Sequence, residues 1–309
     1  MRSAGFLPGL FRLLGEGAPQ VPPAGLAAIA GLFAGRVKGE WLPLNQKLDV
    51  CVSSSDPGAF RFSVSDFGER GALGRVIMRY AASFGDSYDL AALGRFLKAG
   101  AALGAAHQTT LGLDWGTGQN APRLKVYHEE LYPVYDGRLK AGLLSGACGL
   151  KRLPSKADLD ALSAVCLDLT PGRGRDFKLY FRREAPAGLR VPPWQKRTMA
   201  GLGLEKKCFY YEMRGAGSGR RKAYKVYETG GISDLTPAMR EICGLYAAGG
   251  RPAALQKILS LVAYARRAGM TMAPVLFAAG DGAGKSGRTL DAYFCFKKAP
   301  AGRKRGGAR

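Results

Sequence analysis

The chain has 309 residues, of which 47% are hydrophobic, so it can bury the core of one large globular domain or two ordinary ones. Its formal net charge of +22 calls for an anionic partner, such as nucleic acid, a lipid surface or a phosphorylated substrate. With only His107 and His128 present, a histidine-rich metal site is excluded. The six cysteines show no C-x-x-C spacing and four lie in strand-like runs, which favours buried, reduced thiols over disulfides or zinc.

No apolar stretch is long enough to cross a bilayer. The most apolar stretch, 21–35, is short and opens with Pro22-Pro23. The first fifteen residues carry one early Arg and a Leu/Phe pattern that leaves a weak targeting segment open, but no convincing small-residue cleavage site follows the apolar stretch. We therefore expect a soluble, cytoplasmic protein.

In chain order, five pairs of β-rich runs are each joined by a turn that contains glycine, which is typical of β-hairpins. The predicted pairs are 48–52 with 60–65, 110–115 with 123–129, 164–169 with 177–182, 207–213 with 223–227, and 274–279 with 290–296. Helical patterns cover 72–84, 88–102, 156–164, 236–246 and 251–268. Between the second and third hairpins the helical pattern is poorly defined.

This alternation predicts an α+β fold. Five hairpins separated by helices give ten antiparallel strands in five ααββ-like repeats of roughly fifty residues. We expect a ten-stranded antiparallel barrel, wide enough to enclose a ligand, with a polar lumen and with outer helices that cover its apolar outward faces. The expected division is a helical lead-in over 1–40, the barrel over 41–299 and a basic flexible tail over 300–309.

A charged residue, one spacer and a tyrosine recur in the second strand of successive hairpins. The copies are Lys125-Val126-Tyr127, Lys178-Leu179-Tyr180, Lys225-Val226-Tyr227 and Asp291-Ala292-Tyr293, with a degenerate copy at Arg61-Phe62-Ser63. Residues two apart in a strand share a face, so each charged group points the same way as its tyrosine. The pattern indicates that several strands aim cations and phenols at one shared interior.

The predicted strands and pairs resemble the ABBA-type soluble prenyltransferases, which include indole, phenol and cyanobactin-peptide prenyltransferases. The resemblance spans about 47–298 and rests on the pairs above together with Gly112-Leu113-Asp114-Trp115. It implies that four cations bind an allylic diphosphate: Arg61, Lys125, Lys178 and Lys225. It implies that four tyrosines shield a carbocation: Tyr127, Tyr180, Tyr227 and Tyr293. It also implies that Asp49, on the first strand, accepts the proton lost by the acceptor.

These residue types suit the chemistry that the resemblance implies. Ionisation of an allylic diphosphate separates a delocalised cation from a highly charged anion, which fixed cationic groups stabilise. Aromatic faces hold the organic cation without attacking it and keep water away.

The pattern departs from the family at Ser63, Asp176 and Asp291. We expect the two aspartates to support one Mg²⁺ that stimulates activity without being essential, and we expect no organic cofactor. Asp114 and Asp168, which close the first strands of their hairpins, are interpreted as structural.

The sequence therefore predicts a prenyltransferase that moves an allylic group from a prenyl diphosphate to an electron-rich aromatic small molecule or a peptide side chain and releases diphosphate. One alternative is a basic nucleic-acid-binding protein, with contacts at Arg220-Arg221-Lys222 and 303–309. Another is a non-catalytic protein that binds prenyl diphosphates in the same barrel. Nucleic acid and membrane are not the expected partners, and prenyl chain length, attachment atom and oligomeric state are open.

Overall fold

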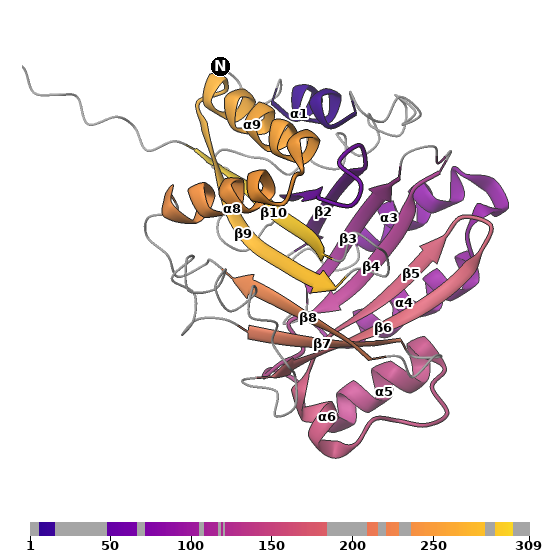
Figure 1. The fold of residues 1–309 in the computed structure, drawn as a ribbon. Helices are drawn as coiled ribbons and strands as arrows, with labels where there is room; N and C mark the ends of the chain where they lie inside the picture. The colour runs from indigo at the N-terminus through magenta and orange to yellow at the C-terminus, as the bar shows by residue number, and fades with distance from the viewer. Residues whose placement is uncertain are drawn as a thin grey trace, which may run out of the picture.

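The computed structural model describes residues 6–15, 48–66, 72–104, 108–116, 119, 121–183, 209–215, 221–228, 236–281 and 288–298. Within them lie ten strands, which form five consecutive hairpins (Figure 1). The strands are β1 (Leu48–Ser53), β2 (Phe60–Asp66), β3 (Gln108–Trp115), β4 (Arg123–Glu129), β5 (Leu162–Thr170), β6 (Gly174–Arg183), β7 (Phe209–Gly215), β8 (Arg221–Glu228), β9 (Met270–Asp281) and β10 (Arg288–Lys298).

The described helices lie before and between these hairpins. They are α1 (Phe6–Gly15), α3 (Ala72–Ala82), α4 (Leu90–Ala101), α5 (Gly137–Cys148), α6 (Lys156–Ala161), α8 (Thr236–Ala248) and α9 (Pro252–Arg267), with a short 3₁₀ turn η2 (Gly85–Ser87). A pair of helices precedes the second, third and fifth hairpins. The expected five-fold ααββ repeat stays a prediction, because the segments 16–47 and 184–208 lie outside the described residues.

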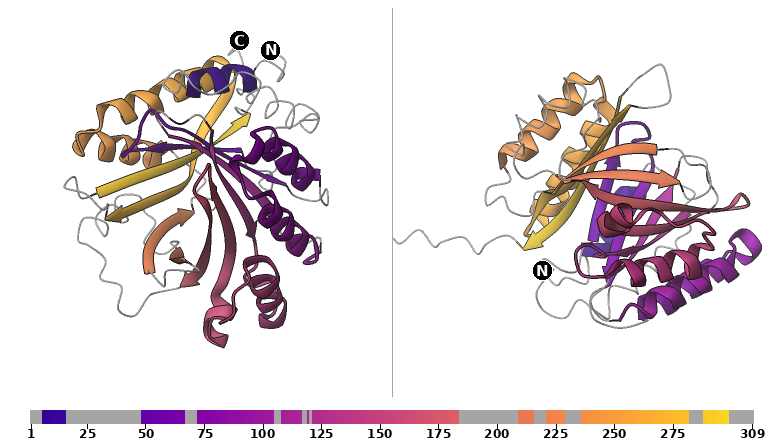
Figure 2. Two further views of the ribbon diagram at one scale, coloured as in Figure 1. Left: turned by 90° about the vertical axis from the view of Figure 1, so that its right-hand side faces the viewer. Right: turned by 90° about the horizontal axis from the view of Figure 1, so that it is seen from below.

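The sheet is antiparallel throughout, and its pairing order closes on itself. Each strand is hydrogen-bonded to its neighbours in the chain, and β1 also pairs with β10, through Cys51 opposite Tyr293 and Ser53 opposite Asp291. The result is a closed barrel with helices on its outside (Figure 2). Because all neighbours run antiparallel, the five hairpin turns lie at one end of the barrel and the longer connections at the other.

The apolar face of the strands points outward into a core shared with the helices. In β4, burial alternates residue by residue, with Leu124, Val126 and His128 buried. Trp115 of β3 is fully buried, with its ring centroid 6.5 Å from that of Tyr80 on α3. His128 stacks on Phe96 of α4 at 4.3 Å and donates through Nε2 to the carbonyl of the same residue at 2.9 Å. This outward burial leaves the alternate residues of each strand to face the interior.

Local sequence explains where the outer helices begin and how they are anchored. Asp89 and Asp136 cap the N-termini of α4 and α5 by accepting hydrogen bonds from backbone amides three residues later. The buried phenol of Tyr246 on α8 donates to the carbonyl of Val52 at 2.7 Å and to that of Leu290 at 3.1 Å. These contacts fasten α8 against the place where β1 meets β10.

The α+β class with an antiparallel sheet and outer helices is confirmed. The predicted strand and helix positions agree with the observed ones to within a few residues, with one helix missed. That helix is α5, whose glycine-rich sequence carries little amphipathic contrast. Among the described helices, none is long and apolar enough to cross a membrane. The five described cysteines, Cys51, Cys148, Cys166, Cys243 and Cys295, are free thiols.

Candidate active site

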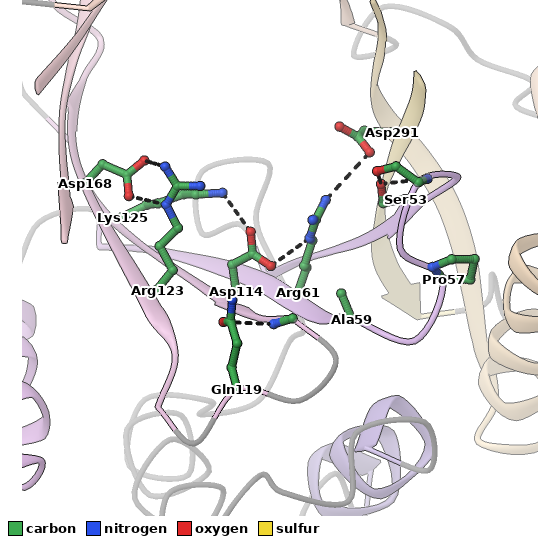
Figure 3. A network of polar contacts seen from close by, with 12 residues as sticks. Ser53, Pro57, Ala59, Arg61, Asp114, Gln119, Arg123, Lys125, Asp168 and Asp291 are labelled. Atoms are coloured by element: carbon green, nitrogen blue, oxygen red, sulfur yellow. Dashed lines mark hydrogen bonds and ion pairs between the residues drawn. The ribbon is translucent and has the colours of Figure 1, made fainter. Parts of the chain in front are cut away.

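Two ion-pair groups line the interior of the barrel toward the hairpin turns (Figure 3). Asp114 of β3 accepts a hydrogen bond from Arg61 Nε of β2 at 2.7 Å and another from Lys125 Nζ of β4 at 3.0 Å. Asp168 of β5 accepts from Arg123 Nη2 of β4 at 2.6 Å and also from Lys178 of β6. We call this set the belt: Arg61, Asp114, Arg123, Lys125, Asp168, Lys178 and Asp291.

Asp291 of β10 extends the belt to the other side of β2. Its Oδ1 atom lies 3.7 Å from Arg61 Nη1, so Arg61 stands between two carboxylates from different strands. The belt therefore takes residues from β2, β3, β4, β5, β6 and β10. Residues that are far apart in the chain meet because the barrel brings their strands together.

Burial and neighbouring charges shift the pKa values of the belt residues Asp114 and Arg61 in opposite directions. Burial by itself would raise the pKa of Asp114, but Lys125 and Arg61 more than offset it and hold that pKa below its ordinary value. Burial would lower the pKa of Arg61, yet Asp114 above all raises it. The side chain of Asp168 is fully buried, whereas those of Lys125 and Lys178 keep 24% and 16% of their surface exposed. The two lysines can thus meet a small anion inside the barrel.

Three of the four predicted shield tyrosines lie together next to the belt. The rings of Tyr127 and Tyr180 have centroids 6.1 Å apart. Burial foremost raises the pKa of Tyr127 well above its ordinary value, and both Tyr180 and Tyr293 raise it further. The pKa of Tyr293 is raised by Cys51 first, then by burial, with a smaller contribution from Tyr180. Tyr127 and Tyr293 therefore stay protonated at neutral pH and present neutral aromatic faces to the same space.

Asp49 lies on β1, between β10, which carries Tyr293, and β2, which carries Arg61. On β1 the inward residues run from Ser53, opposite Asp291 of the belt, through Cys51, opposite Tyr293, to Asp49. On the other neighbour, Asp49 is opposite Ser63 of β2. On that side the register continues from Ser63 to Gly112 of β3 and from there to Lys125 of β4, so Asp49 belongs to the same cross-strand row as a belt lysine.

Two predicted site residues are placed by their backbone alone. Lys225 and Tyr227 lie on β8, where Lys225 is opposite Tyr210 of β7 and Ala279 of β9. Their side chains lie outside the described part of the structure. Their roles stay predictions.

Asp176 and Asp291 do not come together to form the metal site that was expected from the sequence. Asp176 is exposed near the β5–β6 turn, where its Oδ1 accepts from the amide of Phe177, and Asp291 pairs with Arg61. Three strands separate β6 from β10 in the barrel order. Among the described residues no group of three or more His, Cys, Asp or Glu side chains could hold a metal ion.

The interpretation of Asp114 and Asp168 as merely structural overlooked their place beside the cations. Both side chains belong to the inward face and bond the lysines on which the site prediction rests. Strand alternation could have predicted that both aspartates face the lumen. Asp114 shares a strand face with Gly112, two residues away, and Gly112 is opposite Lys125. Likewise Asp168 is opposite Lys125 on its other side.

The comparisons with known proteins bear on the fold. No family model matches the chain, and no curated protein matches it. Among solved structures, AnaPT from Neosartorya fischeri matches with a TM-score of 0.61 and 11% identity over 96% of this chain and 94% of that one. The NotF prenyltransferase matches with a TM-score of 0.60 and 9% identity over 97% of both chains. The chain has the fold of the ABBA-type prenyltransferases.

A second structure of NotF, in complex with brevianamide F and DMSPP, matches with a TM-score of 0.64 and 11% identity over 96% of this chain and 94% of that one. The resemblance inferred from the Lys-x-Tyr pairs is thereby confirmed at the level of the fold. At this identity the activity rests on the residues inside the barrel of this chain.

Proposed function

We propose that this protein is a prenyltransferase, which transfers an allylic group from a prenyl diphosphate to an electron-rich aromatic acceptor and releases diphosphate. One observation carries the proposal. Within a barrel of prenyltransferase fold, the cations Arg61, Lys125 and Lys178 lie beside a group of tyrosines. The NotF complex with brevianamide F and DMSPP supports the same use of this fold.

The belt is the proposed diphosphate site. Arg61, Lys125 and Lys178 come from three different strands and remain partly exposed to the interior. A guanidinium can hold phosphate oxygens in bidentate fashion, and an ammonium offers three donors on a flexible stem. Groups fixed before the reaction stabilise the charge that develops on the departing diphosphate without having to reorganise.

The tyrosines are the proposed cation shield. When the bond between the allylic carbon and the diphosphate oxygen breaks, the positive charge spreads over the allyl group. Tyr127, Tyr180 and Tyr293 offer aromatic faces, and the raised pKa values of Tyr127 and Tyr293 keep these two hydroxyls un-ionised and therefore weak nucleophiles. The allylic carbon then bonds to the electron-rich ring, and the ring loses a proton.

Asp49 is the proposed acceptor of that proton. Its strand, β1, lies between β10, which carries Tyr293, and β2, which carries Arg61, and this position supports a role for Asp49 beside the reacting groups. A carboxylate positioned in this way restores the aromaticity of the acceptor once the new bond has formed.

The proposed metal dependence is modest. The belt carboxylates already have cationic partners, so a Mg²⁺ ion would compete with Arg61, Lys125 and Lys178 for the same oxygens. We expect Mg²⁺ to raise activity by adding charge next to the diphosphate, with residual activity in a chelator.

The decisive experiment is incubation with C5, C10 and C15 prenyl diphosphates against a panel of indoles, phenols and short peptides, followed by mass spectrometry and a pyrophosphate assay. A prenylated product with equimolar pyrophosphate supports the proposal, and the panel separates small aromatic acceptors from peptides. Diphosphate binding without pyrophosphate release would indicate a carrier instead. Salt-sensitive nucleic-acid binding without affinity for any prenyl diphosphate would indicate the nucleic-acid-binding alternative.

A further inference from the structure

Two of the three belt carboxylates, Asp114 and Asp168, are each shared by two cations from different strands. Asp114 lies between Arg61 and Lys125, and its two oxygens each accept one hydrogen bond, at 2.7 and 3.0 Å. Asp168 is shared in the same way by Arg123 and Lys178. Lys125 and Lys178, two of the lysines proposed to hold a diphosphate, are therefore each engaged by a carboxylate.

The charge balance of the belt follows from these contacts. Its four cations, Arg61, Arg123, Lys125 and Lys178, stand against three carboxylates, Asp114, Asp168 and Asp291, so the described belt carries one net positive charge. A diphosphate ester carries several negative charges. A site built only to hold that anion tightly would not place carboxylates within hydrogen-bond distance of its cations, because like charges repel.

We propose that Asp114 and Asp168 are positioning residues that set how tightly the diphosphate is held. They keep Arg61, Lys125 and Lys178 pointing into the lumen, and they compete with the phosphate oxygens for these cations when a diphosphate binds. The inference rests on the proposed function and deepens it. It assigns to the carboxylates a role in releasing the product pyrophosphate, whose affinity they lower.

The donor capacity of the cations allows both partners at once. Arg61 has five N–H donors and each lysine has three, so a diphosphate can bind without breaking every contact to the carboxylates. The carboxylates consequently weaken diphosphate binding without preventing it. Removal of the negative charge of Asp114 should tighten the binding of inorganic pyrophosphate by about tenfold. The Asp114 carboxylate bonds Lys125 in a partly buried site, so an anion held by that lysine would lie close to the carboxylate and be repelled by it.

The test is isothermal titration calorimetry of inorganic pyrophosphate into the full chain and its variants. Asp114→Asn keeps the size of the side chain and removes its charge, whereas Asp114→Glu keeps the charge. We expect tighter binding in the first, and affinity within about threefold of wild type in the second. Asp86→Asn is the matched control, because Asp86 is exposed on η2 and its loss changes net charge by the same amount.

The outcomes separate the inference from the proposed function. A wild-type protein that binds neither pyrophosphate nor a prenyl diphosphate overturns the diphosphate site itself. A wild type that binds pyrophosphate while a folded Asp114→Asn binds it equally or more weakly overturns only the inference. Thermal unfolding verifies that each variant folds. If Asp114→Asn does not fold, Asp114→Ser and Asp168→Asn test the same prediction. In steady-state kinetics, stronger inhibition by product pyrophosphate in the Asn variant is a readout that a merely structural role would not move.

Discussion

The rings of Tyr127 and Tyr180 lie 6.1 Å apart between their centroids, with their planes inclined at 49°. Two strands carry them, β4 and β6, which are separated by β5 in the barrel. The tilted arrangement exposes an aromatic face rather than closing the rings into a stack, as a pocket for a small cation requires.

Substitution at Tyr127 should change the fate of the allyl cation. Tyr127→Phe keeps the ring, and we expect at least half of the normal prenyl transfer. Tyr127→Ser removes the aromatic face and admits water, so the ratio of prenyl alcohol to prenylated acceptor should rise by about tenfold or more. Product analysis by chromatography measures the ratio. An unchanged ratio in the Ser variant would show that Tyr127 does not shield the cation.

Loss of a belt lysine should remove most of the turnover. Lys125→Ala and Lys178→Ala each delete a charged contact to the diphosphate, which is worth about 2 to 4 kcal/mol in a largely enclosed site. We expect kcat/KM to fall by about 10² to 10³, and the same for Lys225→Ala. Lys98→Ala, at an exposed position of α4, is the control and should be neutral. Wild-type turnover in all three lysine variants would contradict the diphosphate site.

Asp49→Asn should slow prenyl transfer while leaving diphosphate binding nearly unchanged. The substitution keeps the shape of the side chain and removes the base, so we expect a loss of about 10² to 10⁴ in transfer rate. Binding should persist, because we assign the diphosphate contacts to the belt cations and not to Asp49. Single-turnover kinetics and pyrophosphate titration measure the two effects separately. A normal transfer rate would assign the proton to diphosphate or water.

Gly100 of α4 should tolerate no side chain, because a Cβ there would lie 1.8 Å from Cε1 of the buried His128. Neither the ring, which stacks on Phe96 and bonds its carbonyl, nor the helix can move freely. We expect Gly100→Ala to lower the free energy of unfolding by about 1 to 3 kcal/mol or more. Gly94 lies on the same helix, and a Cβ added there would have no atom within 4 Å. Gly94→Ala should therefore raise the free energy of unfolding by about 1 kcal/mol. Denaturant unfolding of both variants checks the contrast.

Lys257 of α9 should make stability depend on alkaline pH. Its ammonium donates to the carbonyls of Pro57 and Ala59 at 2.9 and 2.7 Å, and burial lowers its pKa to about 8 from the ordinary 10.5. Between these two values the unfolded chain binds more protons at this residue than the native state. The contribution of Lys257 to stability therefore rises as pH increases from about 8 to 10.5.

The measurement for Lys257 must be differential. Burial raises the pKa of Cys51 and Cys166 to about 12, so these thiols act in the opposite direction and favour unfolding as the pH rises above their ordinary value. The difference in unfolding free energy between wild type and Lys257→Met isolates the lysine. That difference should move in favour of the wild type between pH 8 and 10, and a flat difference would contradict the prediction.

The strand alternation was readable in the sequence because it follows from local geometry. Lys125 and Tyr127 share a face of any strand that contains both, and Leu124 and Val126 must then share the other. The hairpin turns and most helices are equally local, since glycine, proline and capping residues mark their ends. Helix α5 escaped prediction because packing against α4 and α6, rather than its own pattern, holds it in place.

The partners of each charge were decided by tertiary structure alone. Nothing in the sequence around Asp114 reveals that Arg61, 53 residues earlier, will bond it, or that Asp291 will reach the other side of the same arginine. Those pairings depend on the order and register of strands around a closed barrel, which long-range hydrogen bonding fixes. The sequence by itself determined which residues face inward, because side-chain direction in a strand has a period of two. The closure of the strands into a barrel decides which inward residues contact one another. It thereby also decides how much positive charge remains available to a diphosphate.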